Sequence, residues 1–493
     1  MAKILIIGGG VAGLSAGIYA QLNGHQAVVC EKHFIPGGNL TGWQRGEYHI
    51  DNCIHWLTGT NPASRFYNMW NDLGALGDIE VMQGESLYTC EADGVTLGLY
   101  TDLERIRREM LSISPEDKKE INSLIRAVKI MQRVDGIGGK NNDQKMSIGQ
   151  LISGFPTLLK FYSLTTGQLA KRFKHPLLSS FITAFWGEDF GALALIVVFS
   201  TFCGKNGGIP RGSSCAMAER MAERLKSLGG ELLLKKQAVK VNRKDGSAQS
   251  VTFADGEEIA ADYVILACDP DVAFGKMLDV PMPRALRNNY KNYHSRRFSS
   301  YHCAFACDSA DLPFDGDFIL DIPEECRSVL PAKQVIIREF SHEPDFAPHG
   351  KNLLQTLTFC FEQESRKFIE LKQTAKELYK KRKESIAEMQ MKLITDKFPQ
   401  LEGKLRCIDV WTPATYRRYT DSAVGSYMSF ALPSKLFPLR ISSRISGLDN
   451  VLLATQWQLL PGGLPIAAEC GQKTIQTIVK LEKSRRRRAG AEC

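Results

Sequence analysis

The residues near the N-terminus that could do chemistry are three glycines, Gly8, Gly10 and Gly13, spaced as G-x-G-x-x-G. They follow four apolar residues in a row, Ile4–Ile7, which is typical of a buried strand in a parallel sheet. Gly8 would form a tight turn, Gly10 would let the backbone approach a pyrophosphate, and Gly13 would let the next helix pack closely on the strand. The free N–H groups and positive dipole end of that helix favour phosphate. The spacing therefore predicts a dinucleotide site.

An acidic residue lies where the ribose of that nucleotide is expected. A second apolar run, Ala27–Cys30, leads into Glu31, which is 18 residues after Gly13 and close to the usual spacing of about 20. A carboxylate here can accept hydrogen bonds from both ribose hydroxyls, so the pattern favours FAD or NAD over NADP. A glycine-rich turn without a nucleotide is the alternative, and it leaves the combination of strand, helix and acid unexplained.

Two further glycine-rich stretches could contact the same cofactor. Gly37 and Gly38 follow the acid and allow the backbone to lie against a second part of an extended dinucleotide. Near the end of the chain, the apolar strand 451–455 leads into the glycine-rich turn and helix start at 460–471. This arrangement repeats the anion-binding geometry of the first glycine turn.

The order of these features resembles the phytoene desaturase, carotenoid isomerase and retinol saturase group, within the flavin amine oxidase superfamily. The resemblance rests on features in the same order in this chain: the first glycine motif, Glu31, Gly37-Gly38, Thr41, Gly42, Asp51 and His55. The chain departs from the group at Asn39, where arginine is usual, and at Cys53, where glycine is usual. A further local departure is Thr455, because the group often has an acid or glycine nearby.

The resemblance implies an α/β fold of the two-dinucleotide-binding-domain flavoprotein type, with a Rossmann-like FAD-binding domain and an inserted α+β substrate domain. The implied segments are 1–60, 206–275 and 436–480 for the FAD-binding domain, 61–205 for a helical part of the substrate or lid domain, and 276–435 for its mixed sheet and helices. Residues 481–493 are predicted to be a disordered basic tail. Gly136–Asp143 has the composition of a loop.

The implied cofactor is non-covalent FAD, because no cysteine lies where the amine oxidases attach their flavin. The expected cofactor-binding residues are Gly8, Gly10, Val11, Ala12, Gly13, Glu31, Lys32, Gly37, Gly38, Asn39, Thr41, His55, Val239, Thr455, Gly463, Leu464, Pro465 and Ile466. In the group, the residue at the Val239 position pairs its backbone with the adenine edge. The last glycine turn places N–H groups against the flavin pyrimidine edge, where they stabilise the negative charge that develops when the ring accepts a hydride.

The implied function is that of an FAD-dependent oxidoreductase, which desaturates, saturates or isomerises carbon–carbon bonds of an apolar isoprenoid or polyene substrate by hydride exchange at flavin N5. The electron donor or acceptor is left open. Catalytic residues stay unknown, since Arg211, His55 and Tyr419 are only candidates for an acid or base, and His55 could equally form a core hydrogen bond. One alternative is a flavin amine oxidase, to whose aromatic cage Trp457 could contribute. The other is a non-redox FAD-dependent isomerase or hydratase.

The composition is that of a soluble globular protein, with 44% hydrophobic and 24% charged residues among 493. No apolar run reaches the ~18 residues of a membrane span, and the longest, 191–199, is expected in the core or a substrate tunnel wall. The 13 cysteines are scattered without C-x-x-C, which favours free thiols in a reducing cytoplasm over a metal site. Since the first residues already form a strand, no cleavable signal is expected.

The net charge of +8 is uneven, because Lys483–Arg488 alone contributes five positive charges. A solvated tail is the plain interpretation. Attraction to anionic lipid headgroups is the alternative, since each basic residue near a charged leaflet contributes ~1 kcal/mol. Nothing else in the sequence suggests nucleic acid. The expected location is therefore cytoplasmic, with the tail as a candidate contact to a membrane.

Overall fold

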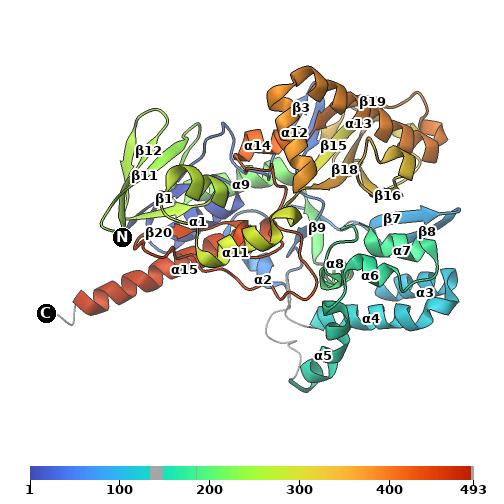
Figure 1. The fold of residues 1–493 in the computed structure, drawn as a ribbon, viewed down its shortest axis with the longest axis horizontal. Helices are drawn as coiled ribbons and strands as arrows, with labels where there is room; N and C mark the ends of the chain where they lie inside the picture. The colour runs from blue at the N-terminus through green and yellow to red at the C-terminus, as the bar shows by residue number, and fades with distance from the viewer. Residues whose placement is uncertain (134–147, 185, 490–493) are drawn as a thin grey trace.

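The computed structural model describes residues 1–133, 148–184 and 186–489. Two regions are evident in Figure 1: one half contains both ends of the described chain, and the second half contains a large sheet and most of the helices. The predicted loop at Gly136–Asp143 lies outside the described residues.

A five-stranded parallel sheet organises the first half. Its strand order is β10-β2-β1-β14-β20, with bounds β1 Lys3–Ile7, β2 Gln26–Cys30, β10 Glu231–Leu233, β14 Tyr263–Leu266 and β20 Val451–Leu453. The central strands are buried because helices cover one face of the sheet and a smaller antiparallel sheet covers the other. Ligands of such sheets bind outside the carboxyl ends of the strands, so the topology places a site beyond Ile7 and Leu453.

Three helices pack against this sheet: α1 Val11–Leu22, α9 Ser213–Ser227 and α15 Leu464–Ala489. Two glycines set the close packing. A Cβ atom at Gly13 would lie 1.8 Å from the carbonyl oxygen of Gly8, and one at Gly471 would lie 2.5 Å from that of Ala12. The Ser15 hydroxyl donates to the Ala468 carbonyl over 2.7 Å. Helices α1 and α15 therefore lie side by side with their N-termini close together (Figure 1).

Smaller strands flank this core. The antiparallel sheet β11-β12-β13 comprises Ala238–Lys244, Ser247–Phe253 and Glu258–Ala260, and short pairs involve β3 Gly42–Arg45, β4 Tyr48–Asp51, β5 Leu57–Thr58, β6 Val81–Met82 and β9 Gly207–Pro210. In β11 the register shifts between Ala238 and Lys240, so Val239 has no partner residue in the β11–β12 ladder.

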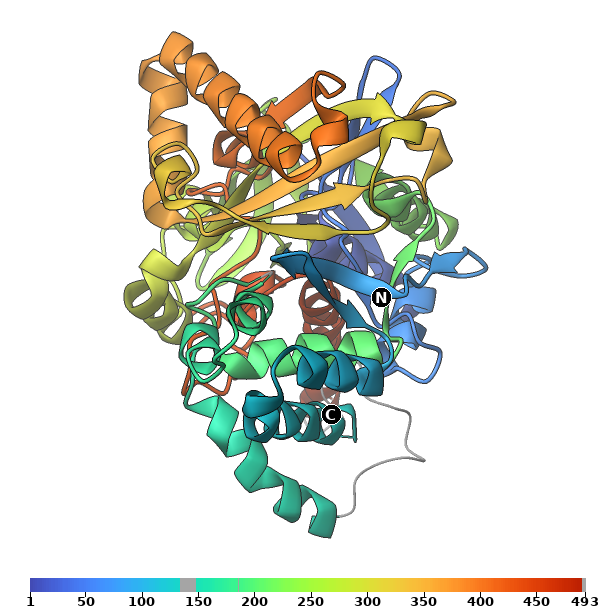
Figure 2. The same cartoon turned by 90° about the vertical axis from the view of Figure 1, so that its right-hand side faces the viewer.

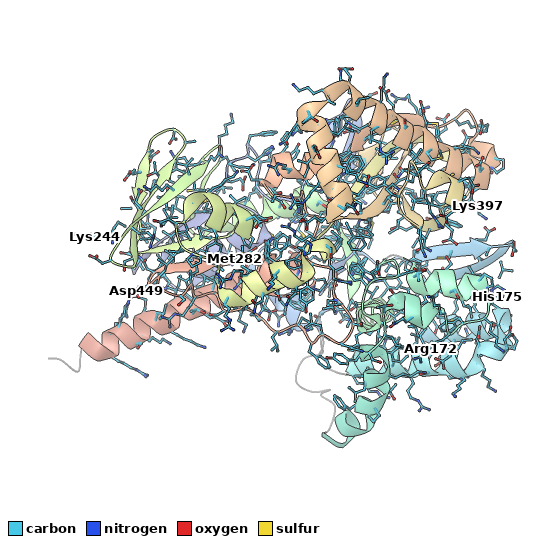
Figure 3. The ribbon with its side chains drawn as sticks, in the orientation of Figure 1. Arg172, His175, Lys244, Met282, Lys397 and Asp449 are labelled. Atoms are coloured by element: carbon cyan, nitrogen blue, oxygen red, sulfur yellow. The ribbon has the colours of Figure 1, made fainter. Side chains whose placement is uncertain are left out.

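A seven-stranded mixed sheet organises the second half, in the order β19-β15-β18-β17-β16-β7-β8. The bounds are β7 Ser86–Ala92, β8 Val95–Tyr100, β15 Phe298–Asp308, β16 Phe318–Asp321, β17 Gln334–Glu339, β18 Lys351–Phe361 and β19 Arg406–Trp411. Helices α12 Glu362–Thr374 and α13 Lys376–Lys397 cover one face (Figure 2). Lys397, which is labelled in Figure 3, lies at the end of α13 and pairs with Glu91 of β7.

The prediction that residues 61–205 are helical is wrong for β7 and β8. These strands join the sheet of the other inserted segment, because β7 pairs in parallel with β16. Their connection is Asp93-Gly94, with φ of 52° and 76°, the left-handed conformations of a tight hairpin turn. The Asp-Gly pair is the sequence signal that could have identified the hairpin.

The remaining helices surround these sheets. They are α2 Arg65–Asp72, α3 Leu103–Ile113, α4 Lys118–Arg133, α5 Ile148–Tyr162, α6 Thr166–Ala170, α7 Pro176–Thr183, α8 Ala192–Cys203, α10 Pro270–Val272, α11 Arg284–Tyr293 and α14 Pro413–Thr420. Helix α8 is apolar on nearly all sides. None of the helices in the described ranges is long and apolar enough to cross a membrane.

The prediction of a disordered tail from residue 481 is also wrong up to Ala489, because α15 continues to that residue. Glu482 and Arg485, near the start of this segment, are hydrogen-bonded to Tyr263 of the parallel sheet. The Arg485 guanidinium donates to the Tyr263 hydroxyl over 3.0 Å, and this hydroxyl donates to Glu482 over 2.5 Å. Arginine also has a high helix propensity. Beyond this contact, the helix extends away from the body (Figure 1).

Candidate functional site

A cavity of about 640 Å³ lies where the glycine-rich turns, helix α8 and strand β18 meet. This volume is within the usual range of ~300–1,000 Å³ for small-molecule sites. One end is bounded by the carboxyl ends of the parallel strands, and the other by apolar side chains of the second half. We call them the glycine end and the apolar end.

The first two glycine stretches form one wall of the glycine end. The Gly37 N–H donates to the Gly9 carbonyl over 2.8 Å. Gly37 has a φ of +111°, and a Cβ there would lie 2.0 Å from the Leu40 carbonyl oxygen, so only glycine fits. The predicted residues Gly8, Gly10 and Gly38 also line the cavity.

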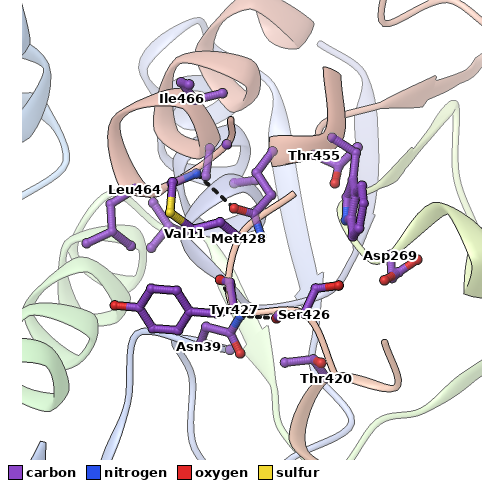
Figure 4. Close-up of a pocket in the computed structure, with 18 of the residues that line it drawn as sticks. Val11, Asn39, Asp269, Thr420, Ser426, Tyr427, Met428, Thr455, Leu464 and Ile466 are labelled. Carbon is purple, nitrogen blue, oxygen red and sulfur yellow. Dashed lines mark hydrogen bonds between the residues drawn. The ribbon is translucent and has the colours of Figure 1, made fainter. Parts of the chain in front are cut away.

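Two helix N-termini open onto this end. Helix α1 begins after Gly10 without a side-chain cap, and Val11 and Ala12 of its first turn line the cavity. Helix α15 begins after a turn in which the Gly463 N–H donates to Gln456 Oε1 over 2.9 Å (Figure 4). The last predicted set, Gly463, Leu464, Pro465 and Ile466, lines the cavity as well. The two dipoles together make this wall favourable to negative charge.

Glu31 lies at the end of β2 and is almost fully buried on the cavity wall. One of its carboxylate oxygens accepts from the Gly9 N–H over 2.7 Å, and the other accepts from the His33 N–H over 2.8 Å. Burial raises the pKa of this carboxyl, and the two N–H donors oppose that rise. The next residue, Lys32, also lines the cavity, and its ammonium lies 2.9 Å from Asp421.

Asn39 and Ser426 present unpartnered polar atoms at this wall. The Asn39 amide donates to the carbonyls of Ser426 and Tyr427 over 3.1 and 3.2 Å. Within the described part of the chain, neither the buried Asn39 Oδ1 nor the buried Ser426 Oγ has a hydrogen-bond partner. Both residues line the cavity (Figure 4). These buried polar atoms are free to form hydrogen bonds with a polar ligand in the cavity.

Val239 and Thr455 also lie on the cavity wall. Because Val239 is the extra residue of the β11 bulge, its backbone is outside the strand ladder. The Thr455 N–H donates to Gln458 Oε1 over 2.9 Å. Two other predicted residues are not brought to the wall. Gly13 packs beneath it, and Thr41 is buried outside the cavity lining.

Helix α8 forms much of the apolar end. Leu193, Ala194, Val197, Val198 and Thr201 line the cavity at the i, i+1, i+4, i+5 and i+8 positions of one helix face. The opposite face packs in the core. Thus the apolar run 191–199 serves as both core and cavity wall.

Aromatic and apolar residues from distant segments complete this end. They are Trp186, Phe359, Tyr427, Leu432, Leu436 and Phe437. The Tyr427 hydroxyl donates to the Cys53 carbonyl over 2.9 Å. Because the side chains on this wall are mostly apolar, an apolar molecule could replace water along most of it.

The three candidates for an acid or base have different surroundings. His55 lines the cavity, and burial, with the charge of Arg338, holds its pKa well below the ordinary value. Its imidazole is therefore neutral near pH 7. Tyr419 lines the cavity, and its ring packs against His33 with centroids 4.5 Å apart and ring planes tilted by 37°. Arg211 does not line the cavity, and its guanidinium donates to the His342 carbonyl over 3.1 Å.

Asp269 was not predicted as a site residue, yet it lines the cavity. Its carboxylate caps α10 by accepting from the Asp271 N–H over 2.9 Å. Burial, followed by repulsion from Asp271, raises the pKa of Asp269 to about 6. The Asp-Pro pair directly after an apolar strand was the available signal, since it marks a helix start at the carboxyl edge of the sheet.

The residues of the glycine end fit a dinucleotide. Four features line the same cavity: the two glycine stretches, the N-termini of α1 and α15, the Glu31 carboxylate, and the unpartnered polar atoms of Asn39 and Ser426. No group of three potential metal ligands occurs among the residues that the structure describes.

Comparison with known proteins gives the family. The family model "Flavin containing amine oxidoreductase" matches residues 11–454. Prolycopene isomerase 1 of an Oncidium hybrid cultivar is 25% identical over 444 residues, which is 86% of this chain and 74% of that protein. Phytoene desaturase (neurosporene-forming) of Rhodobacter capsulatus is 25% identical over 291 residues, covering 56% and 54% of the two chains.

Solved structures support the fold. An oxidoreductase from Methanosarcina mazei matches with a TM-score of 0.62 at 14% identity, over 96% of this chain and 100% of that one. Cyclohexylamine oxidase from Brevibacterium oxydans matches with a TM-score of 0.58 at 15% identity, over 98% and 99%. The predicted Rossmann-type flavoprotein fold and the resemblance to carotenoid desaturases and isomerases are confirmed. The chain therefore belongs to the flavin-containing amine oxidoreductase family and is an FAD-dependent oxidoreductase.

Proposed function

We propose that this enzyme desaturates, saturates or isomerises carbon–carbon bonds of an apolar polyene. One observation carries the proposal: a single cavity joins an anion-binding glycine end to an apolar end. The names of the relatives, a prolycopene isomerase and a phytoene desaturase, point to the same substrate class. A flavin at the glycine end would accept or return a hydride, and a polyene along α8 would be the molecule oxidised, reduced or isomerised.

The chain's own residues position the two molecules and exclude water. The N-termini of α1 and α15 would offset the negative charge of a pyrophosphate and of a reduced flavin ring. Glu31 would bind ribose hydroxyls, and the Val239 backbone would bind adenine. The apolar face of α8 would hold the polyene without polar competition.

Non-covalent binding of the flavin is part of the proposal. Cys30, Cys53 and Cys268 line the cavity, and burial raises the pKa of all three thiols, to about 12 for Cys30 and Cys268. Their thiolate fraction at neutral pH is therefore very small, and the thiolate is the reactive form. Heating the purified protein tests this: flavin absorbance near ~450 nm should pass into the supernatant. Flavin that stays with the precipitate would contradict it.

Product analysis tests the reaction. Purified holoprotein is incubated anaerobically with a detergent-solubilised carotenoid, and products are separated by chromatography and weighed by mass spectrometry. Desaturation should remove two hydrogens per bleached flavin, saturation from pre-reduced flavin should add two, and isomerisation should change retention at constant mass. An unchanged carotenoid, together with turnover of a primary amine, would favour an amine oxidase instead.

The amine oxidase alternative has little support at the site. Trp457 lines the cavity, but its ring packs edge-on against Phe430 with centroids 5.0 Å apart and lies 5.3 Å from Tyr290. It is buried in a cluster rather than open to a substrate amine.

Membrane contact through the basic end of α15 is a separate proposal, supported by the charge of Lys483–Arg488. It predicts binding to anionic vesicles that weakens with salt. The electron donor or acceptor has no assigned site.

A further inference from the structure

One buried serine holds a segment of the cavity wall from behind. Ser214, in the first turn of α9, donates its hydroxyl to Asp51 Oδ2 over 2.9 Å. The same hydroxyl oxygen accepts from the backbone N–H groups of Cys53 and Ile54 over 3.2 and 2.9 Å. Ser214 and Asp51 are both buried, and Ser214 itself does not line the cavity.

The Asp51 carboxylate makes two separate contacts with this serine. Its Oδ1 accepts from the Ser214 N–H over 2.9 Å, and this bond caps α9, because Gly212 has no side chain that could do so. Its Oδ2 fixes the direction of the Ser214 hydroxyl. Burial raises the pKa of Asp51, and the charge of Arg338 and both bonds from Ser214 oppose that rise. The helix cap therefore remains when the hydroxyl alone is removed.

The segment that Ser214 holds is part of the cavity wall. Cys53 and His55 line the cavity, and Ile54 between them is buried. The Cys53 carbonyl accepts from the Tyr427 hydroxyl over 2.9 Å. The peptide group between Cys53 and Ile54 thus donates to Ser214 on one side and accepts from Tyr427 on the other.

Tyr427 lies where the two ends of the cavity meet (Figure 4). Its neighbour Ser426 belongs to the glycine end. Its other neighbour, Met428, contacts the last glycine turn, because a Cβ atom at Gly463 would lie 2.9 Å from Met428 Cε. The Tyr427 ring packs edge-on against Phe359 of the apolar end, with centroids 6.0 Å apart. Under the proposed function, the flavin ring and the polyene would meet beside this residue.

We propose that Ser214 is a positioning residue, which fixes Tyr427 at this junction through the Cys53–Ile54 peptide group. The proposal rests on the proposed function, because it assigns the junction to the contact between flavin and polyene. A misplacement of about 1 Å can lower a rate roughly 100-fold, even when the altered residue touches no reacting atom. The kcat should therefore change more than the binding of either molecule.

Replacement of Ser214 by alanine tests this against a matched neighbour. Ser214→Ala removes the hydroxyl and keeps the bond between the backbone N–H and Asp51. The control is Ser213→Ala, because Ser213 is equally buried and its hydroxyl has no hydrogen-bond partner among the described residues. Bound-flavin absorbance verifies that each variant is folded. Ser214→Cys, whose thiol is a weak acceptor, replaces Ser214→Ala if that variant loses its flavin.

Ser214→Ala should lower the kcat for a detergent-solubilised carotenoid about 10- to 100-fold, while its affinity for the carotenoid stays at the wild-type level. Ser213→Ala should match wild type. Tyr427→Phe should also lower the kcat, and adding Ser214→Ala to it should cause little further loss, because both act through one peptide group. Three results would overturn the proposal: an unchanged kcat in Ser214→Ala, an equal loss in Ser213→Ala, or full additivity with Tyr427→Phe.

The position of Tyr427 can also be followed without substrate. The visible circular dichroism of the bound flavin, near ~450 nm, should change in Ser214→Ala and Tyr427→Phe but not in Ser213→Ala. A wild type that converts no carotenoid would contradict the proposed function alone, because this signal would still report the effect of Ser214. An unchanged flavin signal in Ser214→Ala would overturn the positioning proposal.

Discussion

The two ends of the cavity are built in different ways. The glycine end uses backbone N–H groups from short, contiguous motifs, and its packing leaves no room for a Cβ at Gly13 or Gly37. The apolar end uses side chains from α8, β18 and the segment around Phe437, which are far apart in the sequence. Backbone recognition demands one residue type at a fixed spacing, whereas an apolar wall accepts many residues of about the right size. The first kind of site can therefore be recognised in a single sequence, and the second cannot.

The largest expected effect is at the glycine end. Gly13→Ala would place a Cβ 1.8 Å from the Gly8 carbonyl oxygen, so α1 would have to move off β1. We expect the free energy of unfolding to fall by about 3 kcal/mol, and we expect no bound flavin. Denaturant unfolding and flavin absorbance measure both. The control is Gly275→Ala, because a Cβ at Gly275 meets no atom within 4 Å. If Gly13→Ala kept its flavin, the glycine end would not depend on this packing.

The second prediction concerns pH. The pKa of Asp269 is about 6 in the fold and about 3.9 in an unfolded chain. Between these values the unfolded state ionises first, so the stability of flavin-free protein should fall by about 2–3 kcal/mol as pH rises from 4 to 7. Asp269→Asn removes the charge while its amide oxygen can still accept from the Asp271 N–H. Its stability relative to wild type should increase over this range, and a pH-independent difference would contradict the raised pKa.

The third prediction addresses the apolar end alone. Val197→Phe adds a ring on the cavity-facing side of α8. Turnover of a polyene should fall at least ten-fold, which corresponds to about 1.4 kcal/mol, while flavin binding stays at the wild-type level. Leu22→Phe, at an exposed position at the end of α1, is the matched control. Equal loss of flavin and turnover would mean that the two ends are not separable.

The smallest expected effect is at the end of α15. Arg485→Gln removes a guanidinium whose Cζ lies 5.4 Å from the Tyr263 ring centroid and which donates a hydrogen bond to the Tyr263 hydroxyl. The site is partly exposed, so we expect less than ~1 kcal/mol of lost stability. Arg487→Gln, at an exposed position, should cost nothing measurable by denaturant unfolding. A larger effect of Arg487→Gln would show that the helix end has further contacts.

Sequence reasoning succeeded where local rules decide the structure. The first strand, its glycines and α1 follow from residues 3–22, because strand, turn and helix signals are adjacent. It failed where the structure depends on contacts between residues that are far apart in the sequence. Strands β7 and β8 are stable only beside β16, more than 200 residues away. The end of α15 is held by Tyr263, which the composition of a basic tail does not reveal. The lining of the apolar end is likewise a product of tertiary packing.

The central claim is that one cavity holds a flavin and an apolar polyene in contact. Titration of oxidised holoprotein with a detergent-solubilised carotenoid, followed by the flavin absorbance and fluorescence, tests it most directly. We predict a saturable change in the flavin signal for wild type and Leu22→Phe, and little change for Val197→Phe with its flavin still bound. No saturable change in wild type, or the same change in Val197→Phe, would contradict the claim.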